Sequence, residues 1–229
     1  RYYLGHETIA IFATRLRNGI READALDCMS RATDFAQIPL RDSEEDELTG
    51  LQERVPCQVP GGTATAPGKV NILLQAHISH LFIEDFALVS DARYVAQNAG
   101  RVLQALFELS LDRGFATAAS AFLNLAKSVD KCVWPFEHPL RQYPTLNADV
   151  IHRITMYADD LEVSQVRALP RAALASLLRV NERVAGIVQD AAERFPAIDM
   201  TVRARPLPGD VCRLDIALRR AFTWDERLH

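Results

Sequence analysis

The stretch from Phe86 to Arg113 has the apolar period of one long α-helix, and no other feature of the sequence constrains the fold as strongly. At roughly 100° per residue, its apolar side chains fall on one side of the helix. These residues are Ala92, Val95, Ala99, Val102, Leu103, Leu106, Phe107 and Leu109. The pattern predicts a long helix at the centre of a mainly α fold.

The opposite side of the same helix carries a polar stripe about 80° wide. Its members are Ser90, Arg93, Gln97, Arg101, Gln104 and Glu108. Most of them are amides and guanidiniums, which can donate hydrogen bonds to phosphates, sugars and base edges. An ordinary solvated helix has the same period, so periodicity leaves both interpretations open.

Composition limits what this stripe could do. The chain has 229 residues, of which 48% are hydrophobic, so it can bury the core of one large domain or two small ones. A formal charge of −4 argues against nucleic-acid binding through bulk charge. Such contact must therefore be local, or be supplied partly by a larger assembly. Because the apolar runs are short and interrupted, the sequence predicts no transmembrane helix, and we expect no membrane partner.

Helical patterns dominate the rest of the chain, which we divide into three parts. A multi-helix bundle is predicted over 1–144, with helices at 6–17, 22–35, 43–54, 69–81 and 117–131, a loop at 59–68 and a proline-rich connector at 134–144. A helix-loop-helix module is predicted over 145–196, with short helices at 147–157, 162–168, 171–178 and 182–194. Alternating residues around Pro208-Gly209-Asp210 predict a β-hairpin within 197–229. Two strands do not form a stable sheet alone, so we expect the chain to be a piece of a larger protein.

Sequence motifs for catalysis are absent from the chain. It contains no phosphate loop of the form GxxxxGK[ST] and no GxGxxG, GxSxG or HExxH. Four scattered cysteines, without a CxxC pair, are interpreted as free thiols rather than zinc ligands: Cys28, Cys57, Cys132 and Cys212. His77 and His80 form the one close histidine pair, and we assign it a structural role. We therefore predict no catalytic residue, metal or cofactor in this piece.

A possible helix–hairpin–helix lies between Val163 and Arg194. Modules of this kind that grip a DNA backbone usually have a glycine in the turn, which frees backbone N–H groups for a phosphate. The turn here runs from Arg179 to Glu182 and contains no glycine. Phosphate binding and simple packing against the bundle both remain open, and packing is favoured.

Five segments in register resemble a known family. They are GKVNILLQAHIS (68–79), YVAQNAGRVLQALFEL (94–109), NLAKSVDK (124–131), WPFEHPLRQY (134–143) and FTWDE (222–226). They are similar to the Sec-type unit that follows the motor domains of Ski-like superfamily-two helicases, and RYYLGHETI (1–9) resembles the joint with the preceding winged-helix domain. The resemblance implies a helical bundle, a helix-loop-helix module and the start of an immunoglobulin-like β sandwich.

Two branches of that family carry such units in tandem cassettes, one in the spliceosome and one in the activating signal cointegrator complex. WPFEHPLRQY and the spelling YVAQN resemble the second branch more closely, in particular its fungal members and the first cassette. This implies a cytoplasmic or nuclear parent that works in ribosome rescue and quality control or in alkylation repair. Its implied partners are single-stranded RNA or DNA, the motor domains of the same polypeptide, cointegrator-type subunits and the ribosome.

The resemblance also implies a role for the long helix. In the family this helix acts as a ratchet beneath the motor and touches the translocating strand. Carried over by position, Asn98 and Arg101 face the strand, with Gln97, Gln104 and Arg93 as neighbours. Gln104 and Cys132 stand where relatives often carry arginine, which lowers the local positive charge.

Three functions follow from these observations. The first is a non-catalytic accessory unit that completes the strand channel of an ATP-dependent helicase, with ATP and Mg²⁺ bound in the parent motor domains. The alternative is a protein-interaction scaffold that docks partner subunits or a second helicase cassette. A translocation-factor domain is a third possibility, because the same unit occurs in a protein of endoplasmic-reticulum translocation.

Overall fold

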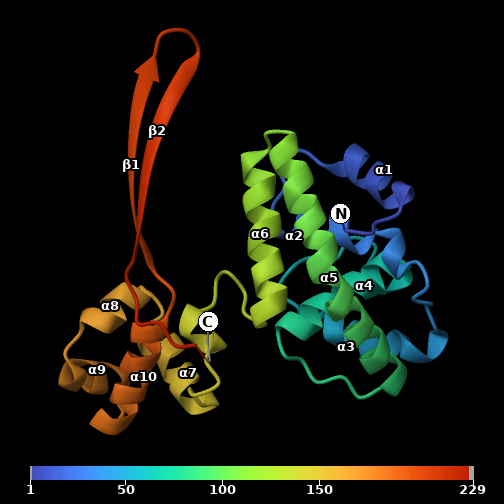
Figure 1. Ribbon diagram of the computed structural model, residues 1–229. Helices are drawn as coiled ribbons and strands as arrows, with labels where there is room; N and C mark the ends of the chain where they lie inside the picture. The colour runs from blue at the N-terminus through green and yellow to red at the C-terminus, as the bar shows by residue number, and fades with distance from the viewer. Residues whose placement is uncertain (1, 227–229) are drawn as a thin grey trace. The chain divides into compact units, whose positions relative to one another are not determined.

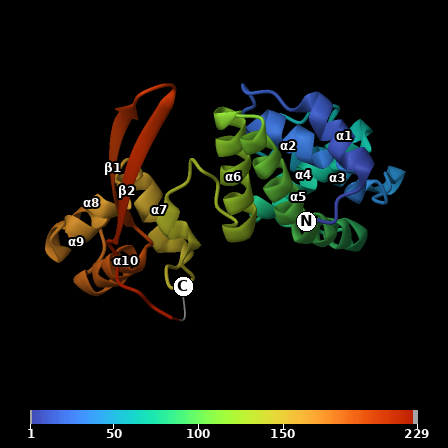
Figure 2. The same cartoon turned by 45° about the horizontal axis from the view of Figure 1, so that its top comes forward.

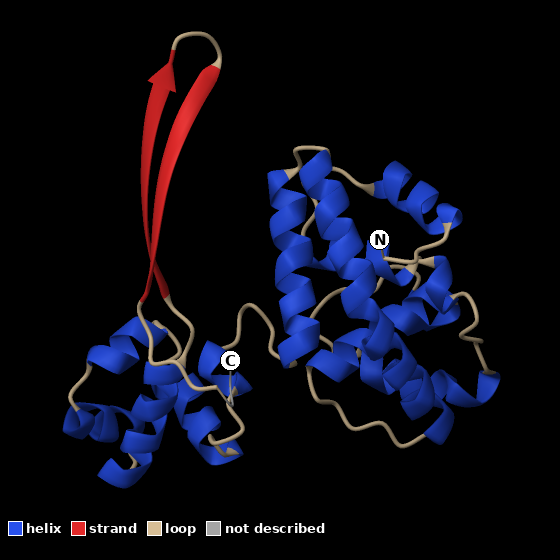
Figure 3. Ribbon diagram, viewed as in Figure 1, coloured by secondary structure: helices blue, strands red, loops and turns tan. Residues whose placement is uncertain are grey.

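The computed structural model describes residues 2–226 and divides into two compact units, Arg1–Phe136 and Glu137–His229 (Figure 1). The described part of the chain is mainly helical, with one β-hairpin near its C-terminal end (Figure 3). The predicted mainly α fold is therefore confirmed. Each unit has a hydrophobic core of its own.

The first unit is a helical bundle. Its α-helices are α1 (His6–Arg15), α2 (Glu22–Ser30), α3 (Glu45–Gln52), α4 (Ala66–Ile78), α5 (Phe86–Asp112) and α6 (Ala116–Lys131). Short 3-10 helices lie between them: η1 (Thr33–Phe35), η2 (Asp42–Glu44) and η3 (Gly62–Ala64). Helices α5 and α6 pack side by side along much of their length (Figures 1 and 2). One core fills the space between α2, α4, α5 and α6, and a second lies under α3, α4 and α5.

Helix α4 is enclosed on almost every side, since each residue from Gly68 to Ile78 except His77 is buried. It begins at Ala66, three residues before the predicted start at Lys69. The reason is a side-chain cap: Thr65 Oγ1 accepts a hydrogen bond from Gly68 N at 3.1 Å. Gly68 itself is required by packing, because an added Cβ would lie 1.9 Å from the carbonyl oxygen of Gly62.

The helix predicted over 22–35 is interrupted. Helix α2 ends at Ser30, and the chain re-forms a single 3-10 turn at η1. The buried Thr8 causes the break, because its hydroxyl accepts a hydrogen bond from Thr33 N at 3.1 Å and pairs with the Thr33 hydroxyl at 2.5 Å. These bonds compete with continuation of the helix.

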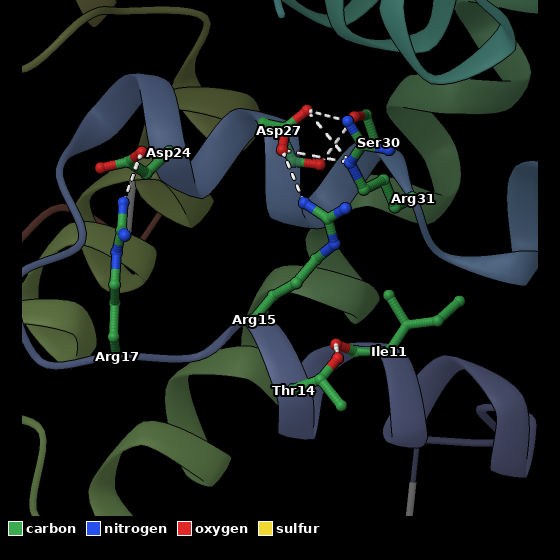
Figure 4. A network of polar contacts seen from close by, with 8 residues as sticks. All are labelled: Ile11, Thr14, Arg15, Arg17, Asp24, Asp27, Ser30 and Arg31. Carbon is green, nitrogen blue, oxygen red and sulfur yellow. Dashed lines mark hydrogen bonds and ion pairs between the residues drawn. The ribbon is translucent and has the colours of Figure 1, made fainter.

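Polar contacts join α1 to α2 (Figure 4). The carboxylate of Asp27 accepts from Arg15 at 3.2 Å and from Arg31, the residue that follows α2, at 2.9 Å. Arg17 pairs with Asp24 at 3.3 Å. Below this surface Cys28 is buried, and burial raises the pKa of its thiol to about 12, so the thiol stays protonated at neutral pH.

The second unit contains short helices and the hairpin. Its helices are η4 (Pro139–Gln142), α7 (Ala148–Tyr157), α8 (Val163–Ala168), α9 (Arg171–Leu178) and α10 (Glu182–Arg194). Leu140 and Tyr143, which precede the boundary predicted at residue 144, pack in the core of this unit with α7 to α10. His138 anchors η4: its Nδ1 accepts from Leu140 N at 3.3 Å, and its Nε2 lies 3.1 Å from the Leu161 carbonyl oxygen. Burial lowers the pKa of His138, which favours the neutral ring that this pattern needs.

The hairpin consists of β1 (Ile198–Leu207) and β2 (Val211–Arg220), paired antiparallel around the predicted turn. Gly209 has φ 82° in that turn, a value that favours glycine. One face of the hairpin carries apolar pairs such as Met200–Leu218 and Val202–Ile216, and the other carries charged pairs such as Asp199–Arg219. Apart from Asp215, every residue of the two strands is exposed.

Candidate nucleic-acid interface

Helix α5 presents the predicted polar face. It is 27 residues long, and Asp85 caps its first turn by accepting from Leu88 N at 2.8 Å. Most of the predicted apolar side is buried in the core, namely Ala92, Val95, Ala99, Val102, Leu103 and Leu106, while Phe107 and Leu109 pack half-buried against it. The helix and its inward face are therefore confirmed.

The structure divides the polar face into two edges. Arg93, Gln97 and Gln104 are exposed along one edge, which we call the open strip. Gly100 lies between Gln97 and Gln104, and a Cβ atom added to it would meet no atom within 4 Å. The open strip is thus an uncovered row of one guanidinium and two amides, with hydrogen-bond donors and a bare stretch of helix backbone between them.

Arg101 lies on the other edge, which we call the tied edge, together with Asn98. Its Nη2 donates to Asp34 Oδ1 at 2.6 Å and to Asn98 Oδ1 at 3.2 Å. Its Nη1 donates to the carbonyl oxygen of Tyr2 at 2.7 Å. Asn98 in turn donates to the Tyr94 carbonyl at 2.9 Å. Arg101 therefore holds the N-terminal segment and η1 against α5, and its side chain keeps 32% exposure.

Asp34 and Tyr2 contact the polar face of α5, and the sequence patterns did not predict either contact. The Tyr2 hydroxyl donates to Glu108 at the far end of the stripe. Asp34 lies 67 positions before Arg101, and no local spacing relates the two residues. Only the folding of η1 onto α5 brings this carboxylate beside the guanidinium.

The first turns of α5 are held by a buried cluster of charges. Lys69 of α4 is fully buried, and its Nζ lies 2.5 Å from Glu44 Oε2 and 2.7 Å from Asp91 Oδ2. The Pro39 carbonyl accepts from the same ammonium at 2.8 Å. Arg41 also pairs with both carboxylates. Two cations and two carboxylates are thus paired, and the cluster ties the first turns of α5 to α4 and η2.

Acidic residues near the start of α3 have further roles. Glu45, Asp46 and Glu47 occupy its first turn, as the pattern SEEDE predicted. The Glu47 carboxylate accepts from the backbone N–H groups of Glu84 and Asp85 at 2.5 and 3.0 Å. Both contacts lie just before α5 and help to fix where that helix begins.

A match over the full sequence decides which family the chain represents. The family model described as the Sec63 Brl domain matches residues 1–229. The chain belongs to the Sec63 Brl domain family. The resemblance drawn from the five segments is therefore confirmed.

Three relatives of this Sec63 Brl domain illustrate its range. The activating signal cointegrator 1 complex subunit 3 of Dictyostelium discoideum is 32% identical over 234 residues, covering 100% of this chain and 10% of the relative. The RQC trigger complex helicase SLH1 of Saccharomyces cerevisiae is 36% identical over 229 residues, covering 100% of this chain and 11% of the relative. The U5 small nuclear ribonucleoprotein 200 kDa helicase of Homo sapiens is 31% identical over 228 residues, covering 100% of this chain and 10% of the relative. The chain spans about a tenth of the length of these curated relatives.

The histidine pair of this Sec63 Brl domain lies beside Cys132 at the end of α6. His77 Nε2 is 3.4 Å from Cys132 Sγ, and His80 Nε2 is 3.1 Å from the Cys132 carbonyl oxygen. Burial, and secondarily the charge of His80, lowers the pKa of His77. Among residues 2–226, no three His, Cys, Asp or Glu side chains are grouped so that they could hold a metal ion.

The turn between α9 and α10 is the second segment considered for phosphate binding. Asn181 caps α10 by accepting from Val184 N at 2.9 Å, and Arg153 donates to the Arg179 carbonyl at 2.9 Å. The Arg179 guanidinium lies 4.6 Å from the centre of the Tyr157 ring. These contacts account for the geometry of the turn within its own unit, and phosphate binding there stays a prediction. Within the described part of the Sec63 Brl domain, no helix combines the length and apolar character needed to span a bilayer.

Proposed function

We propose that this Sec63 Brl domain is a non-catalytic accessory unit of an ATP-dependent nucleic-acid helicase, and that the open strip of α5 lines the path of its single strand. The observation that carries the proposal is the open strip itself. Arg93, Gln97 and Gln104 are exposed donors, whereas the acidic side chains of α5 nearest to them, Asp91 and Glu108, are engaged within the chain. The strip therefore presents hydrogen-bond donors to an approaching phosphate, and the two nearest carboxylates of α5 are engaged elsewhere.

The relatives support the helicase context. Two of them, from Saccharomyces cerevisiae and Homo sapiens, are helicases by name, and the third is named as a subunit of a complex. Since the chain matches about a tenth of each, the remainder of such a protein has room for the motor domains. In our proposal ATP and Mg²⁺ bind in those domains, and this unit contributes strand contact alone.

Weak contacts suit a unit of this kind. A translocating motor must release and regrip its strand, so contacts worth about 1–3 kcal/mol each are sufficient. The formal charge of −4 keeps non-specific attraction low, so that affinity is confined to one strip of one helix. The strand is RNA or DNA, because the donors of the open strip address features that both share.

For the parent protein we propose work in ribosome rescue and quality control, with alkylation repair as a second task, in the cytoplasm or nucleus. The name of the yeast relative, a helicase of the RQC trigger complex, supports the first of these. Subunits of a cointegrator-type complex and the ribosome are the proposed partners, on the basis of the named complexes of the relatives.

The decisive experiment replaces Arg93, Gln97 and Gln104 by Ala together in the full-length protein. We expect ATP-driven unwinding to fall about tenfold or more, because three strand contacts are lost, while assembly with partner subunits is unchanged. The matched control replaces Gln37, Arg54 and Gln58 by Ala, which removes one guanidinium and two amides from exposed positions outside α5. Normal unwinding by the open-strip variant would refute the proposal.

A protein-interaction scaffold is the second candidate function, and the complexes named in two of the relatives favour it. The β-hairpin, with Val202 and Ile216 paired on its apolar face, is the segment at which docking is tested. If docking dominates, Val202→Asp with Ile216→Asp should abolish co-purification of partner subunits, whereas the open-strip variant should leave both assembly and unwinding intact. The two variants therefore separate the two functions.

A further inference from the structure

Arg101 is partly masked by groups of its own chain. Its Nη1 donates to the carbonyl oxygens of Tyr2 and Tyr3, at 2.7 and 3.4 Å. Its Nη2 donates to Asp34 at 2.6 Å and to Asn98 at 3.2 Å. The N–H groups on both terminal nitrogens are thus engaged inside the domain. A strand phosphate can use these donors only by displacing one of the present acceptors.

Among those acceptors, Asp34 carries the negative charge and resembles a phosphate most closely. Carboxylates and phosphates both accept charge-assisted hydrogen bonds from a guanidinium in similar geometry. Arg101 lies about 40–60° around the helix from Gln97 and Gln104, so it borders the open strip. A phosphate bound on that strip therefore lies beside the guanidinium that Asp34 neutralises.

The position of Asp34 is fixed independently of Arg101. Its backbone carbonyl accepts from the Tyr94 hydroxyl at 3.2 Å, and its Oδ2 lies 3.4 Å from Thr8 Oγ1. The neighbouring Thr33 is bonded to the buried Thr8. Because these contacts hold the carboxylate at the edge of α5, it stays available to recapture Arg101 after a phosphate leaves.

We propose that Asp34 competes with the strand phosphate for Arg101 and so limits how tightly α5 holds the strand. This inference rests on the proposed function and names Asp34 as the group that limits the affinity of α5 for the strand. Exchanging a carboxylate for a phosphate replaces one charge-assisted hydrogen bond by another, so the net gain on binding is small. The strand is then released readily at each step of the motor.

The test is Asp34→Asn in the full-length protein, because Asn keeps the size and the acceptor oxygen but removes the charge. Binding of a fluorescein-labelled single-stranded oligouridylate is followed by anisotropy over a range of salt concentrations. We expect Kd to fall about two- to fivefold, and the slope of log K against log salt to steepen by about 0.7, because one more phosphate is neutralised. Tighter holding should also slow ATP-driven unwinding.

Two controls isolate the competition. Asp112→Asn makes the same charge change at an exposed position of α5, about 16 Å further along the helix from Arg101, and should leave both Kd and slope unchanged. Adding Arg101→Gln to Asp34→Asn should cancel the gain, because the released guanidinium is then absent. Asp34→Ser removes the same charge and provides the same readout if the Asn variant is poorly folded.

The outcomes separate the inference from the proposed function. If the open-strip variant weakens strand binding but neither Asp34 variant tightens it, the competition is overturned and the strand-facing role stands. Weaker binding by the Asp34 variants would show that the ion pair only supports the fold, and would also overturn the competition. If the open-strip variant binds normally, the proposed function itself fails.

Discussion

The two edges of the polar face of α5 use similar side chains in different ways. Arg93 on the open strip is exposed, whereas Arg101 two turns later is bonded to Asp34, Asn98 and the backbone of Tyr2. The difference arises from what packs beside each edge, since η1 and the N-terminal segment cover only one of them. A polar stripe on a helix can therefore combine groups that hold the fold with groups that are available to a ligand.

This comparison predicts that changes at bonded groups alter stability, while changes on the open strip alter binding only. Lys69→Met should have the largest effect, because it leaves Glu44 and Asp91 without the buried ammonium. Removing one partner of a buried ion pair costs about 3–5 kcal/mol. Hydrogen–deuterium exchange in the full-length protein should show faster exchange in α4 and α5.

A rescue variant checks this explanation. Adding Glu44→Gln to Lys69→Met removes one of the two carboxylate charges that lose the ammonium, and it should restore part of the protection from hydrogen exchange in α4 and α5. If Lys69→Met exchanges like the unmodified protein, the cluster does not fix α5.

Arg101→Gln should have the next largest effect. It removes the ion pair to Asp34 and the bond to the Tyr2 carbonyl, so we expect the N-terminal segment to loosen at a cost of about 1–2 kcal/mol. Exchange should rise in residues 2–8 and in η1, while the distant α4 stays protected. Unchanged exchange in both segments would show that the bonds of the tied edge contribute nothing to stability.

Gly100→Ala should shift stability in the opposite direction. Its added Cβ meets no atom within 4 Å, and alanine is favoured over glycine in a helix interior by about 0.5–1 kcal/mol. Slower exchange in the middle of α5 is the expected result. Gly68→Ala is the matched comparison, and it should destabilise α4, because its Cβ would lie 1.9 Å from a carbonyl oxygen.

The smallest effect on stability is expected for the open-strip variant. Arg93, Gln97 and Gln104 are exposed, so their joint replacement by Ala should change local stability by less than about 0.5 kcal/mol per site. Exchange in α5 should match that of the unmodified protein even though unwinding is strongly reduced. A marked loss of protection would mean that the unwinding defect is an indirect result of unfolding.

Local patterns predicted the elements well where one physical signal dominated. The apolar period placed α5 within one residue of its observed end, and the turn residues Pro208-Gly209-Asp210 placed the hairpin. Predicted helix bounds were wrong where side-chain hydrogen bonds to the backbone changed the end or the start of a helix. Thr8 interrupts the helix expected over 22–35, and the Thr65 cap extends α4 toward the N-terminus.

The candidate site was predicted only in part. The helical period identified the polar stripe, which includes Arg93, Gln97, Arg101 and Gln104. Asn98 and the strand-facing role of all five residues came from the family resemblance, and their strand contacts remain predictions. The helical period contained no information about which of them are bonded inside the domain. Asp34 and Lys69 are far from α5 residues 91–101 in sequence, so their ion pairs required the packed structure.

The sequence by itself determined that this chain is a helical Sec63 Brl domain with a long amphipathic helix, because periodicity, caps and turn residues are local properties and the family segments lie in order along the chain. Tertiary structure alone decided which polar groups of that helix are open. Packing of η1 and α4 against α5 sets Asp34 beside Arg101 and Lys69 beside Asp91, and leaves Arg93, Gln97 and Gln104 exposed. Contacts between residues far apart in the chain are formed by the fold, and no local pattern encodes them.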